Sequence, residues 1–434
     1  MLEKWMEQVR EIPFVDAHCH VMPQGIGEYA TGNAPFKGQS RLAGLLTGFG
    51  SLLNFLSAGM SQEELNGIRS GMYSKEQAKE TVLQYLPKVE TMLPVAFCRR
   101  GLSLLAGQPV EINRDTWDAL EALMVGSDYD RIVSAMDRDN IEKGVLNLWT
   151  GWSASYYGRY WQTLSEADKA KDRRAFVNSA TFDFYALAPF APATREYARL
   201  LHADAETFAG YEDLLHRLAR YFVENCDARA FKISEMYFRK LDYEKVERSA
   251  AERCFKEVRT AEEERTLANF VTWTVLEEAR RWNKPVQIHT GELWGDPAID
   301  QVNPMYLLNA VRTFPDVRFE LLHGGYPFTA ETGILAQNFS NVVLNLAYMP
   351  LRSLTHFEQW LEIYGNLIPS DRILLGTDVF DIDCMAGCVD MIRDSCARYA
   401  NRLEEQGVAS EAAITRMLHK IFHENAEQYY GFSR

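Results

Sequence analysis

The chain has 434 residues, 47% of them hydrophobic, which is enough for a large buried core. Its formal net charge of −14 argues against nucleic acid and a membrane surface as partners, because both need a concentrated basic surface. No stretch approaches the roughly 18 uncharged apolar residues of a membrane span, and residues 1–10 are too charged for a signal peptide. The cysteines are scattered and lack a CxxC pair, so we expect reduced thiols and a cytoplasmic protein.

Short apolar runs alternate with longer helical segments along the chain, a pattern typical of β–α–β units and a parallel sheet. The candidate strands, in order, are residues 12–17, 143–149, 182–188, 228–233, 285–289, 317–323, 341–346 and 372–377. Eight such units predict an α/β fold of the (β/α)₈ TIM-barrel type, as a single domain over residues 1–434.

Two stretches are too long to be simple connections. Residues 21–129 follow the first strand and carry helical or irregular signals, which predict a helical cap insertion over the barrel mouth. Residues 234–283 follow the fourth strand and have helical periodicity with many charges, which predicts a second helical insertion.

The sharpest local signal is the sequence DAHCH at residues 16–20. Side chains alternate along a strand, so His18 and His20 project to the same side and can chelate one ion. They follow the first strand, and barrel enzymes place their chemistry at the carboxyl ends of strands. Asp16 points the same way, either as a buttress for an imidazole or as a polar core residue, and both interpretations stay open.

Three further side chains end predicted strands: His289, His323 and Asp378. One isolated histidine is usually an ordinary core or loop residue, but four of the nine histidines here end strands of one barrel. Imidazole and carboxylate are donors suited to zinc and similar ions, and such an ion lowers the pKa of a bound water. We expect a divalent metal, zinc first, on His18, His20, His289 and Asp378. Asp378 would also accept the proton of the water, and His323 would activate the substrate.

This order and spacing resembles the amidohydrolase superfamily, and in particular its family 2. The motifs that carry the resemblance lie at residues 231–239 (FKISEMYFR), 285–291 (PVQIHTG) and 322–328 (LHGGYPF). They are similar to the hydrolase domain that some plants and fungi fuse to a glutamine-synthetase-like domain. The resemblance implies the four ligands above, with His323 either binding a second metal or activating the substrate in one-metal members.

The role of Lys232 distinguishes a site for one metal ion from a site for two. It resembles the fourth-strand lysine that is carbamylated and bridges the metals in two-metal amidohydrolases, but single-metal relatives also carry a lysine there. We favour one metal per chain, with Lys232 as a further candidate ligand.

The substrate side is less defined. Residues that follow barrel strands are candidates for the pocket, although ordinary loop packing is the alternative for each: Tyr237, Arg239, Glu292, Tyr326, and also Trp294 and Asn345. Arg239 would suit a substrate carboxylate, which its planar fork can bind with two hydrogen bonds.

The expected activity is hydrolysis of an amide, lactone or related C–N or C–O bond in a small polar molecule; homo-oligomerisation is left open. A uronate isomerase is the first alternative, since those enzymes share the barrel, the HCH sequence and a long insertion after it. They are expected to carry an arginine shortly after the last aspartate, and residues 379–381 contain none. A metal-dependent decarboxylase is a further alternative. A non-catalytic binding protein is disfavoured because every expected ligand type is present.

Overall fold

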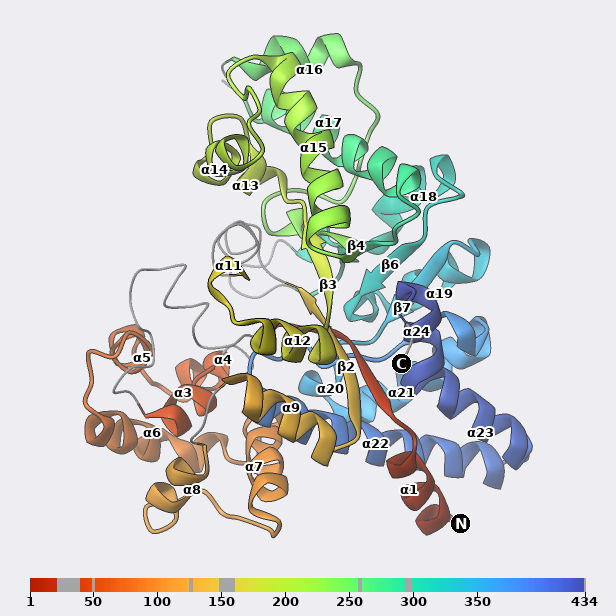
Figure 1. The fold of residues 1–434 in the computed structure, drawn as a ribbon. Coiled ribbons are helices and arrows are strands. Elements are labelled where there is room, and N and C mark those ends of the chain that lie inside the picture. Colours follow the sequence, from red (N-terminus) through yellow and green to blue (C-terminus); the bar gives the residue numbers. More distant parts are fainter. Residues whose placement is uncertain are drawn as a thin grey trace.

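The computed structural model describes residues 1–21, 40–48, 51–124, 128–147, 161–256, 260–292 and 299–432. Its strands form one parallel sheet in the order β1 to β8, and Figure 1 shows them in the middle of the molecule. The bounds are β1 Phe14–Cys19, β2 Ile141–Asn147, β3 Phe176–Thr181, β4 Ala228–Ile233, β5 Val286–His289, β6 Phe319–Leu322, β7 Val342–Asn345 and β8 Ile373–Leu374. The predicted (β/α)₈ barrel is confirmed.

The predicted third strand, residues 182–188, is wrong. The strand is β3, and the aromatic run after it forms the single-turn helix α13 (Phe184–Leu187). The apolar pattern misled because β3 carries Asn178 and Ser179, which hydrogen-bond to the Cys226 carbonyl and to Gln287 and so tolerate burial. Paired polar groups of this kind weaken the apolar signal of a real strand.

The barrel closes between its last and first strands through backbone hydrogen bonds. The Ala17 amide donates to the Leu375 carbonyl at 2.9 Å, the Asp378 amide to the His18 carbonyl at 2.8 Å, and the His20 amide to the Val379 carbonyl at 2.8 Å. The segment after β8 therefore runs beside the end of β1, although β8 itself is short.

The barrel interior has an apolar part and a polar part. Small apolar side chains from several strands fill it together with a C-terminal aromatic: Val15, Ala17, Val145, Val177, Ala230, Val343, Leu374 and Tyr430. Beside them, buried Glu320 accepts hydrogen bonds from Asn345 at 2.7 Å, Gln287 at 3.1 Å and the Tyr430 hydroxyl at 2.8 Å. The C-terminal helix α24 (Asn425–Tyr430) thus contributes a side chain to the inside of the barrel.

The remaining helices lie around the strands (Figure 1). Those before β2 are α1 Leu2–Glu11, α3 Arg41–Leu46, α4 Leu52–Ser57, α5 Gln62–Arg69, α6 Lys75–Val89, α7 Leu93–Ala106, α8 Trp117–Leu123 and α9 Asp128–Arg138. Those between β2 and β5 are α11 Trp161–Thr163, α12 Glu166–Ala175, α13, α14 Pro192–Leu200, α15 Phe208–Asn225, α16 Arg248–Phe255 and α17 Ala261–Arg281. Those after β5 are α18 Leu308–Thr313, α19 Thr329–Asn338, α20 Met349–Arg352, α21 Leu354–Leu367, α22 Ile382–Glu405, α23 Glu411–His419 and α24. No described helix is both long and apolar enough to cross a membrane.

The helices α3 to α8 come from the stretch predicted as a cap, and they gather on one side of the barrel in Figure 1. Helix α7 packs along α22, the helix that follows β8, and also contacts α20. Glycines permit this close crossing: a Cβ on Gly101 would lie 1.8 Å from the Asp383 carbonyl oxygen, and one on Gly387 would lie 2.0 Å from the Phe97 oxygen. Residues 22–39 lie outside the described part, so closure over the mouth stays a prediction.

Candidate metal centre

Two histidines and one aspartate converge at the carboxyl ends of the strands, which we call the mouth of the barrel. The Nε2 atoms of His18 and His20 each lie 3.2 Å from Asp378 Oδ1. One ligand atom from each of these three residues lies within 4.8 Å of the others, and the two histidines are buried. We call these three residues the metal group. The backbone bonds between β1 and the segment after β8 bring them together.

Asp16 fixes the backbone of this group. Its carboxylate accepts hydrogen bonds from the Thr377 amide at 2.9 Å, the Thr377 hydroxyl at 2.5 Å and the His18 amide at 3.2 Å. Burial raises the pKa of Asp16 to about 7. Its contacts run to Thr377 and to backbone, so Asp16 ties the end of β1 to the residue before Asp378 instead of supporting an imidazole.

A hydrogen bond at Nδ1 fixes the orientation of the His20 ring. Its Nδ1 lies 2.7 Å from the carbonyl oxygen of Asn147, so Nδ1 carries the hydrogen and Nε2 directs a lone pair at the site. Phe380 stacks on the other side of the ring, with centroids 4.6 Å apart. Buried His18 Nδ1 has no partner among the described residues, so no such bond selects its tautomer.

The charge states suit a cation. Burial alone raises the pKa of Asp378, but the neighbouring imidazoles of His323, His18 and His20 outweigh it and hold that pKa well below its ordinary value. Burial, reinforced by the Lys232 ammonium, keeps the pKa of His18 well below its ordinary value. Ionised carboxylate and neutral imidazole are the forms that bind metals, so the donor set fits a divalent ion of the zinc type.

His289 and His323 form a pair beside the metal group. His323 Nδ1 lies 3.2 Å from the Ala347 carbonyl oxygen and so carries a hydrogen, which leaves Nε2 to accept from His289 Nδ1 at 3.1 Å. In neutral rings, His289 Nε2 then has only a lone pair, facing the Glu292 carbonyl oxygen at 3.1 Å. A cation would stabilise these two facing acceptors. His289 lies outside the metal group itself, so its role as a fourth ligand stays a prediction.

Lys232 enters the site from β4, as its strand position predicts. It is buried, and its Nζ lies 3.3 Å from His18 Nε2. Burial lowers the pKa of its ammonium group to about 8. The amine therefore lies next to the metal group, and its role as a ligand stays a prediction.

The predicted substrate residues divide into those near the histidines and those engaged elsewhere. Tyr237, 42% exposed, has its ring 5.3 Å from that of His289. The Glu292 carboxylate accepts from Arg352 Nε at 2.9 Å. The ring of Tyr326 lies against Trp360, with centroids 5.4 Å apart. Of these side chains, Tyr237 is the one that contacts the histidine pair.

The guanidinium of Arg239 is buried and hydrogen-bonds to other groups of the protein. Its Nε donates to Glu235 at 2.6 Å, Nη1 to Asn269 at 2.7 Å and Nη2 to Thr272 at 3.0 Å. These bonds connect the turn after β4 to helix α17, and we found no contact of Arg239 with the histidines in the described residues. Asn345 likewise belongs to the barrel interior, bonded to Glu320, and Trp294 lies outside the described residues.

Sequence reasoning missed two residues that follow β7, Tyr348 and Arg352. The ring of Tyr348 lies 5.8 Å from that of His323, and the Arg352 guanidinium stacks 4.8 Å from the Tyr348 ring. The φ angles of His323, Tyr348 and Asp378 are 66°, 69° and 62°, a left-handed conformation that bulky side chains rarely adopt. Backbone strain of this kind clusters at functional sites. In the sequence, the only sign of a functional role for Tyr348 and Arg352 is that both residues follow a strand.

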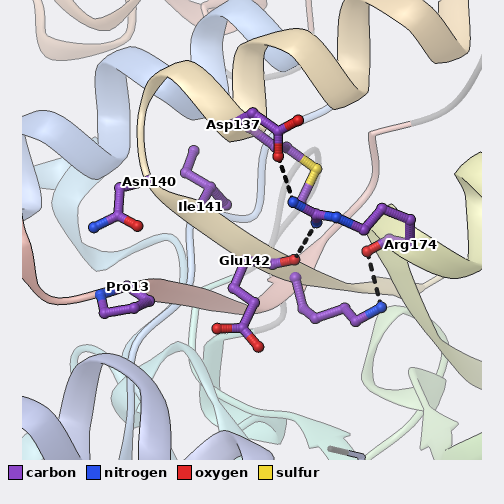
Figure 2. A pocket seen from close by; sticks show the side chains of 8 residues that line it. Pro13, Asp137, Asn140, Ile141, Glu142 and Arg174 are labelled. Atoms are coloured by element: carbon purple, nitrogen blue, oxygen red, sulfur yellow. Dashed lines mark hydrogen bonds and ion pairs between the residues drawn. The ribbon is translucent and has the colours of Figure 1, made fainter. Parts of the chain in front are cut away.

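A separate cavity of about 420 Å³ lies at the opposite, amino end of the barrel. Figure 2 shows Arg174 reaching toward Asp137 and toward the backbone of Glu142. The Lys143 ammonium donates to the Arg174 carbonyl at 2.8 Å. These charged groups are already paired within the protein, so we place the functional site at the mouth.

The fold and the metal group define an α/β-barrel protein with a candidate metal centre at the carboxyl ends of its strands. The chain belongs to the amidohydrolase family, whose model matches residues 15–432. The resemblance inferred from the motifs is therefore confirmed at the level of the family.

Known proteins resemble the chain in part or in whole. Protein fluG of Emericella nidulans is 39% identical over 97 residues, which are 22% of this chain and 11% of that protein. The chain thus matches only a small part of the length of this curated relative. Among solved structures, uronate isomerase of Thermotoga maritima has a TM-score of 0.78 at 13% identity, covering 99% of this chain and 97% of that one. Glucuronate isomerase of Caulobacter crescentus has a TM-score of 0.76 at 14% identity, covering 100% and 94%. At these identities the likeness shows a shared fold.

Proposed function

We propose that this protein is a metal-dependent hydrolase that cleaves an amide, lactone or related C–N or C–O bond in a small polar substrate. The observation that carries the proposal is the buried metal group, with both Nε2 atoms 3.2 Å from one carboxylate oxygen. A zinc-type ion bound there would polarise the substrate carbonyl and lower the pKa of a water toward neutrality.

Asp378 is the proton carrier in this proposal. Its Oδ1 faces the two imidazoles, and no contact of its Oδ2 is found among the described residues. Its low pKa keeps it ionised near neutral pH, so it can accept a proton from the attacking water and deliver it to the leaving group.

His323 holds and orients His289. Its Nδ1 hydrogen bonds to the Ala347 carbonyl, and its Nε2 accepts from His289. Burial lowers the pKa of His323 to about 4, so the ring is neutral near pH 7. For His323 to donate to a substrate oxygen, as the sequence led us to expect, Nε2 would have to give up its bond with His289 and take a proton.

An aldose–ketose isomerase is the second candidate. The whole-chain likeness to uronate and glucuronate isomerases favours it, including the comparable length. Against it stands the segment after Asp378, where Phe380 stacks on His20 and residues 379–381 contain no arginine.

The test is metal analysis of the purified protein combined with turnover assays on amides, lactones and uronates. We expect one zinc-type ion per chain and turnover of an amide or lactone. Asp378→Asn should lower turnover by roughly 10² or more while the protein stays folded. Asp381→Asn is the matched control, because asparagine can replace this carboxylate as the N-cap of α22. Full activity of Asp378→Asn would refute the proton-carrying role, and turnover of uronates alone would establish the isomerase.

A further inference from the structure

The loop after β7 builds one wall of the mouth from an aromatic ring held between two partners. The rings of His323 and Tyr348 form a T-shaped pair, and the guanidinium of Arg352 lies over the Tyr348 ring at 4.8 Å. Glu292, from the loop after β5, binds Arg352 through Nε at 2.9 Å and also through Nη2. Arg352 is therefore fixed on one edge by a carboxylate and on one face by a ring.

Two hydrogen-bond donors in this wall have no partner among the residues that the structure describes. Glu292 binds the Nε and Nη2 positions of Arg352, and the Nη1 group of Arg352 has no hydrogen bond or ion pair with the described residues. The hydroxyl of Tyr348 likewise has no hydrogen bond there, although the residue is half-buried. The Arg352 side chain is only 29% exposed. Donors that are held in place at the mouth and have no protein partner there are available to the oxygens of a ligand.

The wall adjoins the metal group. The His323 ring lies 5.8 Å from the His18 ring on one side and 5.8 Å from the Tyr348 ring on the other. A substrate of a few bonds in length can span from the metal group to this wall.

We infer that the Arg352 Nη1 group and the Tyr348 hydroxyl form an anion subsite that binds a carboxylate of the substrate. The inference rests on the proposed function, and it names the substrate class as carboxylated small molecules. Arginine and tyrosine both donate to carboxylate oxygens, and a guanidinium held rigid loses little freedom on binding. Glu292 positions Arg352 but also neutralises it, so it weakens the subsite that it orients.

The test uses hydroxamates, which chelate zinc, as probes of the zinc-loaded protein by titration calorimetry. Acetohydroxamate reports on the metal alone. The monohydroxamates of succinic, glutaric and adipic acid add a carboxylate on arms of increasing length. We expect at least one of the three to bind about tenfold or more tightly than acetohydroxamate.

Variants distinguish carboxylate binding at the subsite from hydroxamate binding at the metal. Arg352→Met and Tyr348→Phe should each remove most of the gain from the carboxylate while leaving acetohydroxamate binding unchanged. Glu292→Gln should increase the gain, because the competing charge is lost. Arg312→Met is the control: Arg312 also stacks on a ring, that of Phe339, but lies on α18, and its loss should change neither affinity.

The outcomes are distinct. Failure of acetohydroxamate to bind the zinc-loaded protein overturns the proposed metal function and the subsite with it. If acetohydroxamate binds but no carboxylate arm tightens binding, the subsite alone is overturned. A gain that survives Arg352→Met also overturns it.

Discussion

Replacing Glu320 by glutamine should change how the stability of the protein depends on pH. Burial raises the pKa of this carboxyl from 4.5 to about 7 in the folded protein. The folded state therefore holds the proton more tightly than the unfolded state, so the stability of the wild type falls as pH rises from about 4.5 to 7. At 1.36 kcal/mol per pKa unit, the full penalty above pH 7 is about 3 kcal/mol.

Glutamine has no such penalty and can keep the contacts. Its oxygen can accept from Asn345 and Gln287, and its amide can donate to the Tyr430 hydroxyl, which can then donate to the Ala17 carbonyl. We expect the difference in unfolding free energy, Glu320→Gln minus wild type, to rise by about 2.5 kcal/mol between pH 5 and 8. Urea unfolding in the presence of EDTA measures it without pH-dependent metal binding.

Glu404→Gln is the control for this prediction. Hydrogen bonds from Lys4 and Trp5 hold the pKa of the Glu404 carboxyl below its ordinary value. This carboxyl is thus ionised in both states between pH 5 and 8, and the stability it contributes is lost only at lower pH. The difference in unfolding free energy between this control variant and the wild type should therefore stay constant over that range. A flat difference for Glu320→Gln as well would refute the reasoning about its buried carboxyl.

Three further predictions concern the metal group and the insertion. Thr377→Val removes the 2.5 Å bond to Asp16 and should lower stability by about 1.5–3 kcal/mol and weaken zinc binding in a chelator competition. Thr332→Val, which loses a bond to the Phe328 carbonyl in α19, should spare zinc affinity. Zinc at 100 times its Kd should stabilise the wild type against urea by about 2.7 kcal/mol, and His20→Ala should lose that gain. Gly101→Ala should destabilise by about 1–3 kcal/mol, because its Cβ would meet the Asp383 carbonyl across the α7–α22 contact; an unchanged urea midpoint would contradict that packing.

Sequence periodicity located most of the barrel because parallel strands are buried on both faces and read as apolar runs. It failed at β3, where the buried Ser179 hydroxyl and the half-buried Asn178 amide donate to partners that only the folded chain supplies. It also extended the eighth strand beyond Leu374, to residue 377. Residues after Leu374 pair with β1 by single backbone bonds, a tertiary arrangement that has no local pattern.

The site was predictable where residue type and strand position coincide. Two histidines in alternation at the end of β1 and an aspartate after β8 are such a case, and the structure brings them together. Arg239 shows the limit of the method. Its partners Asn269 and Thr272 lie some thirty residues later on α17, so sequence position alone could not distinguish a substrate ligand from a buried structural link.

The placement of Asp378 follows from how the barrel closes. Its amide donates to the His18 carbonyl, and Thr377 beside it is bound by Asp16, two residues before His18. One strand therefore supplies both the two imidazoles and the carboxylate that anchors the third member of the metal group. Weakening the Asp16–Thr377 contact should loosen barrel closure and metal binding together. The contacts between β1 and the segment after β8 therefore hold the residues of the candidate metal centre in place.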